Sequence, residues 1–127
     1  MLKDSYAFSG FSVDDLAAAE KFYGGNTWFR NYSRKQHADA TSSVRWNNTG
    51  VFKGAGHEPA SYAVLNFPVD DIDTIADELI VDVVTFEIYD GMHQDEKGIV
   101  GGKAANAGSD IAWFKDPVGN TLSILKD

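Results

Sequence analysis

The side chains able to do chemistry are scattered along this chain, and their spacing matches no common catalytic motif. The three histidines lie far apart. A histidine beside carboxylates can move protons near neutral pH, and His93 is followed closely by Asp95 and Glu96. Glu87 lies in an apolar run that alternation would pleat as a strand. His93 and Glu87 are therefore the candidates for acid-base chemistry, while histidines in solvated loops are commonly without a catalytic role.

Metal and thiol chemistry have little support in the sequence. The 127 residues include no cysteine, which excludes disulfides, a thiolate nucleophile and cysteine-ligated metals. His37 and His57 stand in polar sequence and are expected at the surface, and the histidines show no paired ligand spacing. We expect no cofactor and no bound metal.

The charge and the apolar runs exclude several classes of partner. A formal net charge of −8 argues against binding nucleic acid, whose affinity rests on Lys and Arg at phosphates. Apolar runs fall far short of the ~20 residues of a membrane span, and no signal-type apolar core follows the N-terminus. We predict a cytoplasmic protein with no nucleic-acid or membrane partner.

Two corners of the chain are near copies of each other. Phe-Ser-Val-Asp-Asp at 11–15 returns as Phe-Pro-Val-Asp-Asp at 67–71, 56 positions later. A repeated unit of this kind indicates a repeated supersecondary module. In each copy an apolar strand precedes acidic residues that can cap a helix. We predict a single domain, residues 1–127, of two modules at about 5–56 and 60–127.

The remaining segments are predicted as strands and loops. Short strands are expected around 28–32, 43–47 and 51–53, with a hairpin turn at 47–50 and a linker at 54–59. In the second half we predict strands at 61–69, 83–89, 111–115 and 121–125, with a long loop at 90–110. The last two strands form a hairpin around Asp-Pro-Val-Gly-Asn at 116–120.

Three segments resemble one known superfamily. They are 11–16, which leads into Phe-Tyr at 22–23, then 65–72, and 114–122 with its Asp-Pro-x-Gly-Asn turn. This pattern resembles the vicinal oxygen chelate superfamily, which includes glyoxalase I, bleomycin resistance proteins and extradiol dioxygenases. The resemblance implies an α+β fold in which two βαβββ modules form curled mixed sheets around a concave site. It also implies a homodimer.

The same resemblance shows where metal-dependent relatives carry their ligands. The corresponding positions are Phe8 in the first module, Val64 in the second and Ser123 in the last strand, none of them a good ligand for a divalent ion. The fourth ligand cannot be placed by motif. Metal-dependent glyoxalase or dioxygenase activity is therefore not expected, and whether the protein turns over any substrate is left open.

The replaced ligand positions describe an apolar pocket with a few hydrogen-bonding groups, which is typical of a small-molecule site. We expect a metal-independent binder of a cationic or aromatic organic molecule. The alternatives are a lyase, isomerase or dioxygenase using a displaced metal or His93 and Glu87, and an interaction domain filled by its own aromatic side chains. The expected ligand-binding residues are Phe8, Ser12, Trp46, Val64, Asn66, Trp113 and Ser123.

Overall fold

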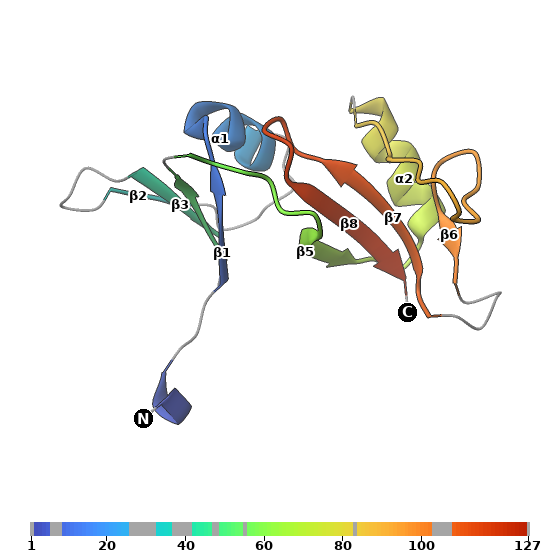
Figure 1. Cartoon of the computed structure of the whole chain (residues 1–127), viewed down its shortest axis with the longest axis horizontal. Coiled ribbons are helices and arrows are strands. Elements are labelled where there is room, and N and C mark those ends of the chain that lie inside the picture. The colour runs from blue at the N-terminus through green and yellow to red at the C-terminus, as the bar shows by residue number, and fades with distance from the viewer. Residues whose placement is uncertain are drawn as a thin grey trace. The chain divides into compact units, whose positions relative to one another are not determined.

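Each half of the chain begins with a strand that leads into a helix, as the repeated corner predicts (Figure 1). The computed structural model divides the chain into two compact units, residues 1–59 and 60–127. It describes residues 2–5, 9–25, 33–36, 42–46, 49–54, 56–82, 84–102 and 108–126.

The first unit is a four-stranded sheet with a helix against one face. After a short 3-10 helix, Leu2–Asp4, come β1 (Ser9–Val13), α1 (Leu16–Gly25), β2 (Ser33–Gln36), β3 (Ser42–Trp46) and β4 (Thr49–Lys53). The strand order is β1-β4-β3-β2, with β1 parallel to β4 and the other pairs antiparallel. The ring of Phe11 meets the ring of Tyr23 edge-on at 5.8 Å, so this side of β1 lies beneath α1.

The second unit repeats this topology. Its elements are β5 (Ala63–Pro68), α2 (Ile72–Val81), β6 (Val100–Gly101), β7 (Asp110–Lys115) and β8 (Thr121–Lys126). The order β5-β8-β7-β6 reproduces β1-β4-β3-β2, and β5 is parallel to β8 as β1 is to β4. The fold is therefore α+β with mixed sheets, as the sequence predicts.

Aspartates start both helices. Asp71 caps α2 and its Oδ1 accepts a hydrogen bond from the Thr74 backbone N–H at 3.1 Å, while Asp15 accepts from the Ala18 N–H at 3.0 Å. The bonds from the Thr74 backbone and hydroxyl lower the pKa of Asp71. Because this folded-state pKa lies below the unfolded value, the cap stabilises the fold at neutral pH, and its contribution is lost as the pH falls through the acidic range.

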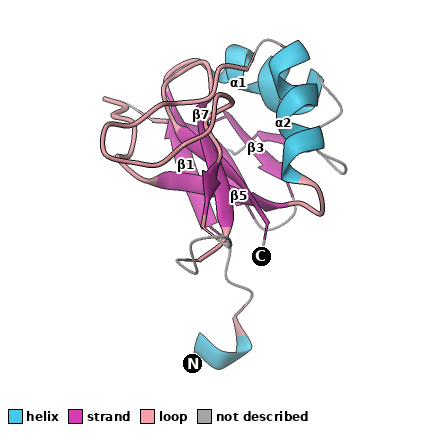
Figure 2. Ribbon diagram, turned by 90° about the vertical axis from the view of Figure 1, so that its right-hand side faces the viewer, coloured by secondary structure: helices cyan, strands magenta, loops and turns pink. Residues whose placement is uncertain are grey.

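An apolar layer fills the space between α2 and its sheet. Figure 2 shows α2 lying against one face of the strands, and its Ile72, Ala76 and Leu79 are buried. Since side chains along a strand alternate between faces, the residues between the buried apolar positions of β7 and β8 belong to the opposite face. The buried apolar residues of these two strands are Ala112, Phe114, Leu122 and Ile124.

The middle of the first unit differs in part from the sequence prediction. The strand expected at 28–32 lies outside the described residues, and the described strand that precedes β3 is β2, Ser33–Gln36. The other two strands are confirmed as β3 and β4, paired with Trp46 opposite Thr49. The two residues between them, part of the predicted turn, are also outside the described residues.

The prediction for residues 83–110 was wrong in two respects. Residues 84–89 form no strand, because Phe86 makes a single antiparallel bridge to Phe114 of β7. The predicted loop contains β6, where Val100 pairs with Ile111. The segment around Phe86 and strand β6 therefore both pair with the outer edge of β7, and neither has room to form a long strand. The hairpin of β7 and β8 is confirmed.

Candidate ligand-binding site

The register of the second sheet brings three of the expected residues into one line. Asn66 of β5 is opposite Ser123 of β8, and Ser123 is opposite Trp113 of β7. We call Asn66, Ser123 and Trp113 the cross-strand row. Ser123 and Trp113 belong to the face opposite the apolar layer, because their strand neighbours form that layer. Asn66 shares this face, because its side chain is hydrogen-bonded to that of Ser123.

The row has a buried centre between two accessible ends. Ser123 is fully buried, Trp113 is half-buried and Asn66 is exposed. The Ser123 hydroxyl donates to Oδ1 of Asn66 at 2.5 Å, which satisfies a polar group that would otherwise be buried at a cost. The hydroxyl of Ser123 thus fixes the orientation of the Asn66 side-chain amide.

Beyond Trp113 the line continues with two residues of the segment that follows α2. The Glu87 N–H donates to the Trp113 carbonyl at 2.7 Å, and the Tyr89 ring lies edge-on to the Trp113 indole at 5.7 Å and 70°. Burial first, and then the charge of Glu87, raise the pKa of Tyr89. The phenol therefore stays neutral near pH 7 and able to donate. Tyr89 was not among the site residues predicted from the sequence, although its alternation with Glu87 was a signal that both lie on one face.

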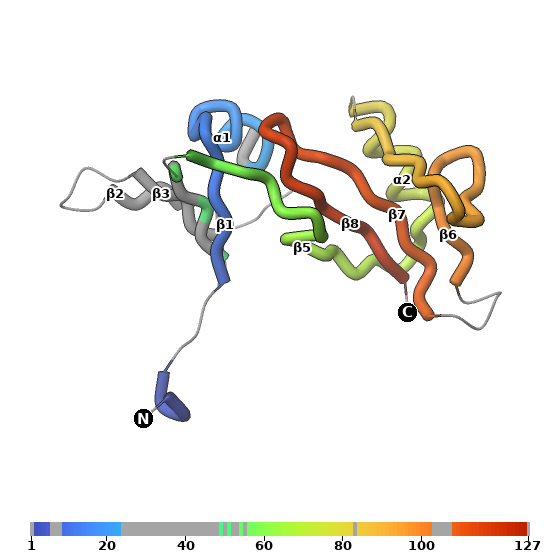
Figure 3. The backbone as a smooth tube through the Cα atoms, viewed as in Figure 1, coloured from blue at the N-terminus to red at the C-terminus, as the bar shows by residue number. Residues whose placement is uncertain are grey.

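One side chain holds this segment in shape. Gln94 Oε1 accepts from the Tyr89 N–H at 2.7 Å, and its Nε2 donates to the carbonyls of Glu87 at 2.9 Å and Gly98 at 2.7 Å. Figure 3 follows the segment from the end of α2 to β6. Gln94 thus replaces the ladder hydrogen bonds that a regular strand would have made. Its side chain binds the backbone of both Glu87 and Tyr89, the two residues next to Trp113.

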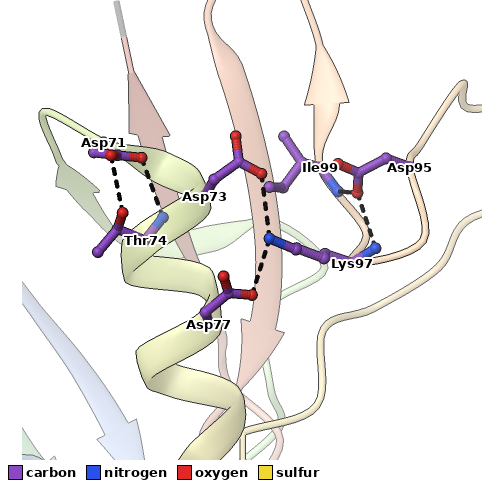
Figure 4. Close-up of polar contacts among 7 residues, drawn as sticks. All are labelled: Asp71, Asp73, Thr74, Asp77, Asp95, Lys97 and Ile99. Atoms are coloured by element: carbon purple, nitrogen blue, oxygen red, sulfur yellow. Dashed lines mark hydrogen bonds and ion pairs between the residues drawn. The ribbon is translucent and has the colours of Figure 1, made fainter.

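A charged contact ties the same segment to α2 (Figure 4). Lys97 Nζ lies 2.9 Å from Asp77 and 3.4 Å from Asp73, and Asp95 Oδ1 accepts from the N–H groups of Lys97 and Ile99, each at 2.9 Å. The bond to Asp77 is the main cause of a raised Lys97 pKa. This stabilisation is present at neutral pH, would be lost only in alkaline solution, and is screened by salt because the contact is at the surface.

Replacing Gln94 with alanine is expected to loosen residues 87–98 as a unit. The variant loses hydrogen bonds worth about 0.5–1.5 kcal/mol each, so the Glu87 amide, whose own bond to Trp113 is untouched, should exchange its proton at least tenfold faster. Amide exchange followed by NMR measures this. His93→Ala, an exposed neighbour, is the matched control. Unchanged exchange at Glu87 in Gln94→Ala would show that Gln94 does not hold the segment.

The ligand-binding residues predicted in the first unit are not part of the cross-strand row. Ser12 Oγ lies 2.8 Å from His57 Nδ1, so His57, predicted at the surface, is half-buried against β1. A Cβ at Gly54 would lie 2.9 Å from the Ser12 Cβ, so that position requires glycine. Trp46 ends β3 opposite Thr49. Phe8 lies outside the described residues.

Val64, the predicted counterpart of a metal ligand in the second module, lies at an irregularity of β5. The register with β8 shifts between Ala63 and Leu65. A bulge re-aims the side chain it carries, so simple alternation cannot give the direction of Val64. Its side chain is half-buried.

The acid-base candidates are in different surroundings. Glu87 lies 4.0 Å from Lys115, while His93 is exposed. Within the described residues, no group of three or more His, Cys, Asp or Glu could hold a metal ion. No described helix is both long and apolar enough to cross a membrane.

The charge of the chain belongs almost entirely to the second unit. Residues 60–127 contain 13 of the 19 acidic residues but only 4 of the 11 Lys and Arg, which gives a net charge of −9. Residues 1–59 contain 6 acidic residues and 7 Lys and Arg, which gives a net charge of +1. The second unit is therefore strongly acidic, whereas the first is close to neutral.

Comparison with known proteins gives the fold a class. No sequence model of a protein family matches the chain, and no curated protein matches it. A member of the glyoxalase/bleomycin resistance protein/dioxygenase superfamily from Sphaerobacter thermophilus is 22% identical with a TM-score of 0.66, covering 99% of this chain and 100% of that one.

Two further solved structures are similar. A glyoxalase family protein from Enterococcus faecalis is 15% identical with a TM-score of 0.63, over 98% of this chain and 99% of that one. TnmS3, an antibiotic binding protein from a Streptomyces species, is 18% identical with a TM-score of 0.62, over 96% and 95%.

The two βαβββ units and these similarities define a class of small α+β proteins. The chain has the fold of the glyoxalase/bleomycin resistance protein/dioxygenase superfamily. This is the fold that the resemblance in the sequence implies.

Proposed function

We propose that this protein binds a small organic molecule over the cross-strand row, without a metal ion. The observation that carries the proposal is the row itself, in which an exposed amide, Asn66, and a half-buried indole, Trp113, lie on one face with Tyr89 beside the indole. A few oriented polar groups among aromatic side chains are typical of small-molecule sites. The antibiotic binding protein among the solved structures with this fold supports a binding role.

The ligand is proposed to be aromatic, cationic or both. Trp113 and Tyr89 offer ring edges and faces for stacking, and the net charge of −9 on residues 60–127 favours a positive group. The ligand contacts proposed in the second unit are Val64, Asn66 and Trp113, with Ser123 as the buried hydrogen-bond partner of Asn66. Phe8, Ser12 and Trp46 of the first unit stay predictions from the sequence, and the proposal over the cross-strand row does not depend on them.

The assembly and location are proposed from the family resemblance and the composition. We propose that the two units form a single domain and that the protein is a cytoplasmic homodimer. The chain has no cysteine and hence no disulfide, which is compatible with a reducing compartment.

Native mass spectrometry of the freshly purified protein tests these points together. We expect a metal-free dimer, with an organic adduct that is released on denaturation. One divalent ion per subunit, whose removal abolishes a measurable reaction, would contradict the proposal and favour the enzyme alternative. A protein that binds no member of a diverse library containing planar and cationic compounds would contradict it in favour of a structural domain.

A further inference from the structure

The hydrogen bond inside the cross-strand row fixes the direction of an amide. Ser123 Oγ and Asn66 Oδ1 are 2.5 Å apart, although the residues are 57 positions apart in the sequence. This separation fits an O–H···O bond, whereas N–H···O bonds are longer, at about 2.7–3.2 Å. The Asn66 oxygen therefore faces the buried serine.

The donor end of the amide consequently faces the other way. In a planar amide, oxygen and nitrogen diverge from the same carbon, and the amide nitrogen of asparagine carries two N–H donors. Since Ser123 is fully buried and Asn66 is exposed, the Nδ2 group is the end available to a molecule lying on the row. The serine hydroxyl has a single proton, already committed to Asn66, so it offers no donor of its own.

We propose that Asn66 acts as a hydrogen-bond donor at the ligand site, so that the site selects planar ligands with a carbonyl-type acceptor on one edge. This inference rests on the proposed function and names the ligand chemistry of the same site. Ser123 is its positioning residue, because it holds the amide with Nδ2 outward.

The row also sets the size of such a ligand. Asn66 and Trp113 are separated by two strand spacings, roughly 10 Å, since Ser123 stands between them. A molecule that stacks on the indole and reaches the amide therefore has two or three fused rings.

A matched series of tricyclic probes tests the proposal. Fluorenone carries a carbonyl acceptor, carbazole an N–H donor, and fluorene neither, on nearly the same planar frame. We expect fluorenone to bind the wild-type protein about two- to tenfold more tightly than fluorene, and carbazole to bind no more tightly than fluorene. NMR titration measures the three dissociation constants.

Variants of the two residues separate donation from packing. In Asn66→Asp the serine bond can persist but the donors are gone, so the advantage of fluorenone should disappear and carbazole should gain. In Asn66→Ala, fluorenone and fluorene should bind equally. In Ser123→Ala the amide is free to flip, which should reduce the fluorenone preference and improve carbazole binding, and restoring a hydroxyl with Ser123→Thr should restore the wild-type order.

A measurement without ligand checks the amide direction by itself. The side-chain carbonyl carbon of Asn66 reports hydrogen bonding to its oxygen, so its NMR resonance should move in Ser123→Ala. No shift there would overturn the orientation of the amide. Equal binding of the three probes to the wild type would overturn the acceptor preference and leave the proposed binding function standing. Failure of all three to bind would overturn the planar tricyclic ligand inferred here, while the library of planar and cationic compounds tests the binding function separately.

Discussion

Replacing Asp116 with alanine is expected to lower the free energy of unfolding by about 3 kcal/mol, a fall in melting temperature of roughly 10 °C for a chain of this size. Asp116 is 5% exposed in the turn between β7 and β8. Its Oδ1 accepts from the N–H groups of Val118 at 3.0 Å and Asn120 at 2.8 Å, and its Oδ2 accepts from Asn120 Nδ2 at 3.0 Å. Alanine leaves these donors without that acceptor.

The position of the turn explains why the loss is large. It joins β7 and β8, the two inner strands in the order β5-β8-β7-β6, so an opened turn disturbs the centre of the sheet. The backbone bonds Asp116 N–H to Asn120 at 2.9 Å and Gly119 N–H to Asp116 at 3.1 Å close the same loop. Gly119 has φ +92°, a conformation that favours glycine.

Two further variants control this prediction. Asp116→Asn keeps Oδ1 but loses the acceptor for the Asn120 amide, so about half of the loss is expected. Asp90→Ala, an exposed carboxylate of the same unit, should change stability by less than about 0.5 kcal/mol. Urea unfolding followed by circular dichroism measures all three. A loss below about 1 kcal/mol in Asp116→Ala would show that the turn does not determine the stability of the hairpin.

Replacing Trp113 with alanine is expected to weaken the binding of fluorenone about 30-fold, or about 2 kcal/mol. The indole supplies the apolar area of the cross-strand row and the edge-on contact with Tyr89 at 5.7 Å. Alanine removes both the stacking surface and the partner that holds the phenol ring. Calorimetry or NMR titration measures the affinity.

Variants that preserve or avoid the site provide the comparison. Trp113→Phe keeps an aromatic face and should retain affinity within about fivefold. Tyr62→Ala removes an aromatic ring that is 70% exposed in the same unit, and it should leave the affinity unchanged. Circular dichroism establishes that each variant is folded before binding is measured. Wild-type affinity in folded Trp113→Ala would remove the indole from the site.

The sequence predicted the parts of the fold that depend on neighbours in the chain. The corners at 11–15 and 67–71 were recognised because capping and alternation are local, and Asp15 and Asp71 cap their helices as predicted. The turn at 116–120 was recognised for the same reason. Residues 84–101 could not be predicted in this way, because Gln94 holds them through bonds to backbone groups and β7 provides their edge.

By itself, the sequence determined the α+β class, the two repeated strand-to-helix corners and the residue types of the candidate site, since these depend on periodicity, turn chemistry and matched motifs. Only the tertiary structure decided that Asn66, Ser123 and Trp113 form one row, because parallel pairing of β5 with β8 joins residues 57 positions apart. It also decided that Tyr89 rather than His93 lies beside the indole. Strand register and the path of a segment along a sheet edge arise from long-range contacts, and no local pattern in the sequence specifies them.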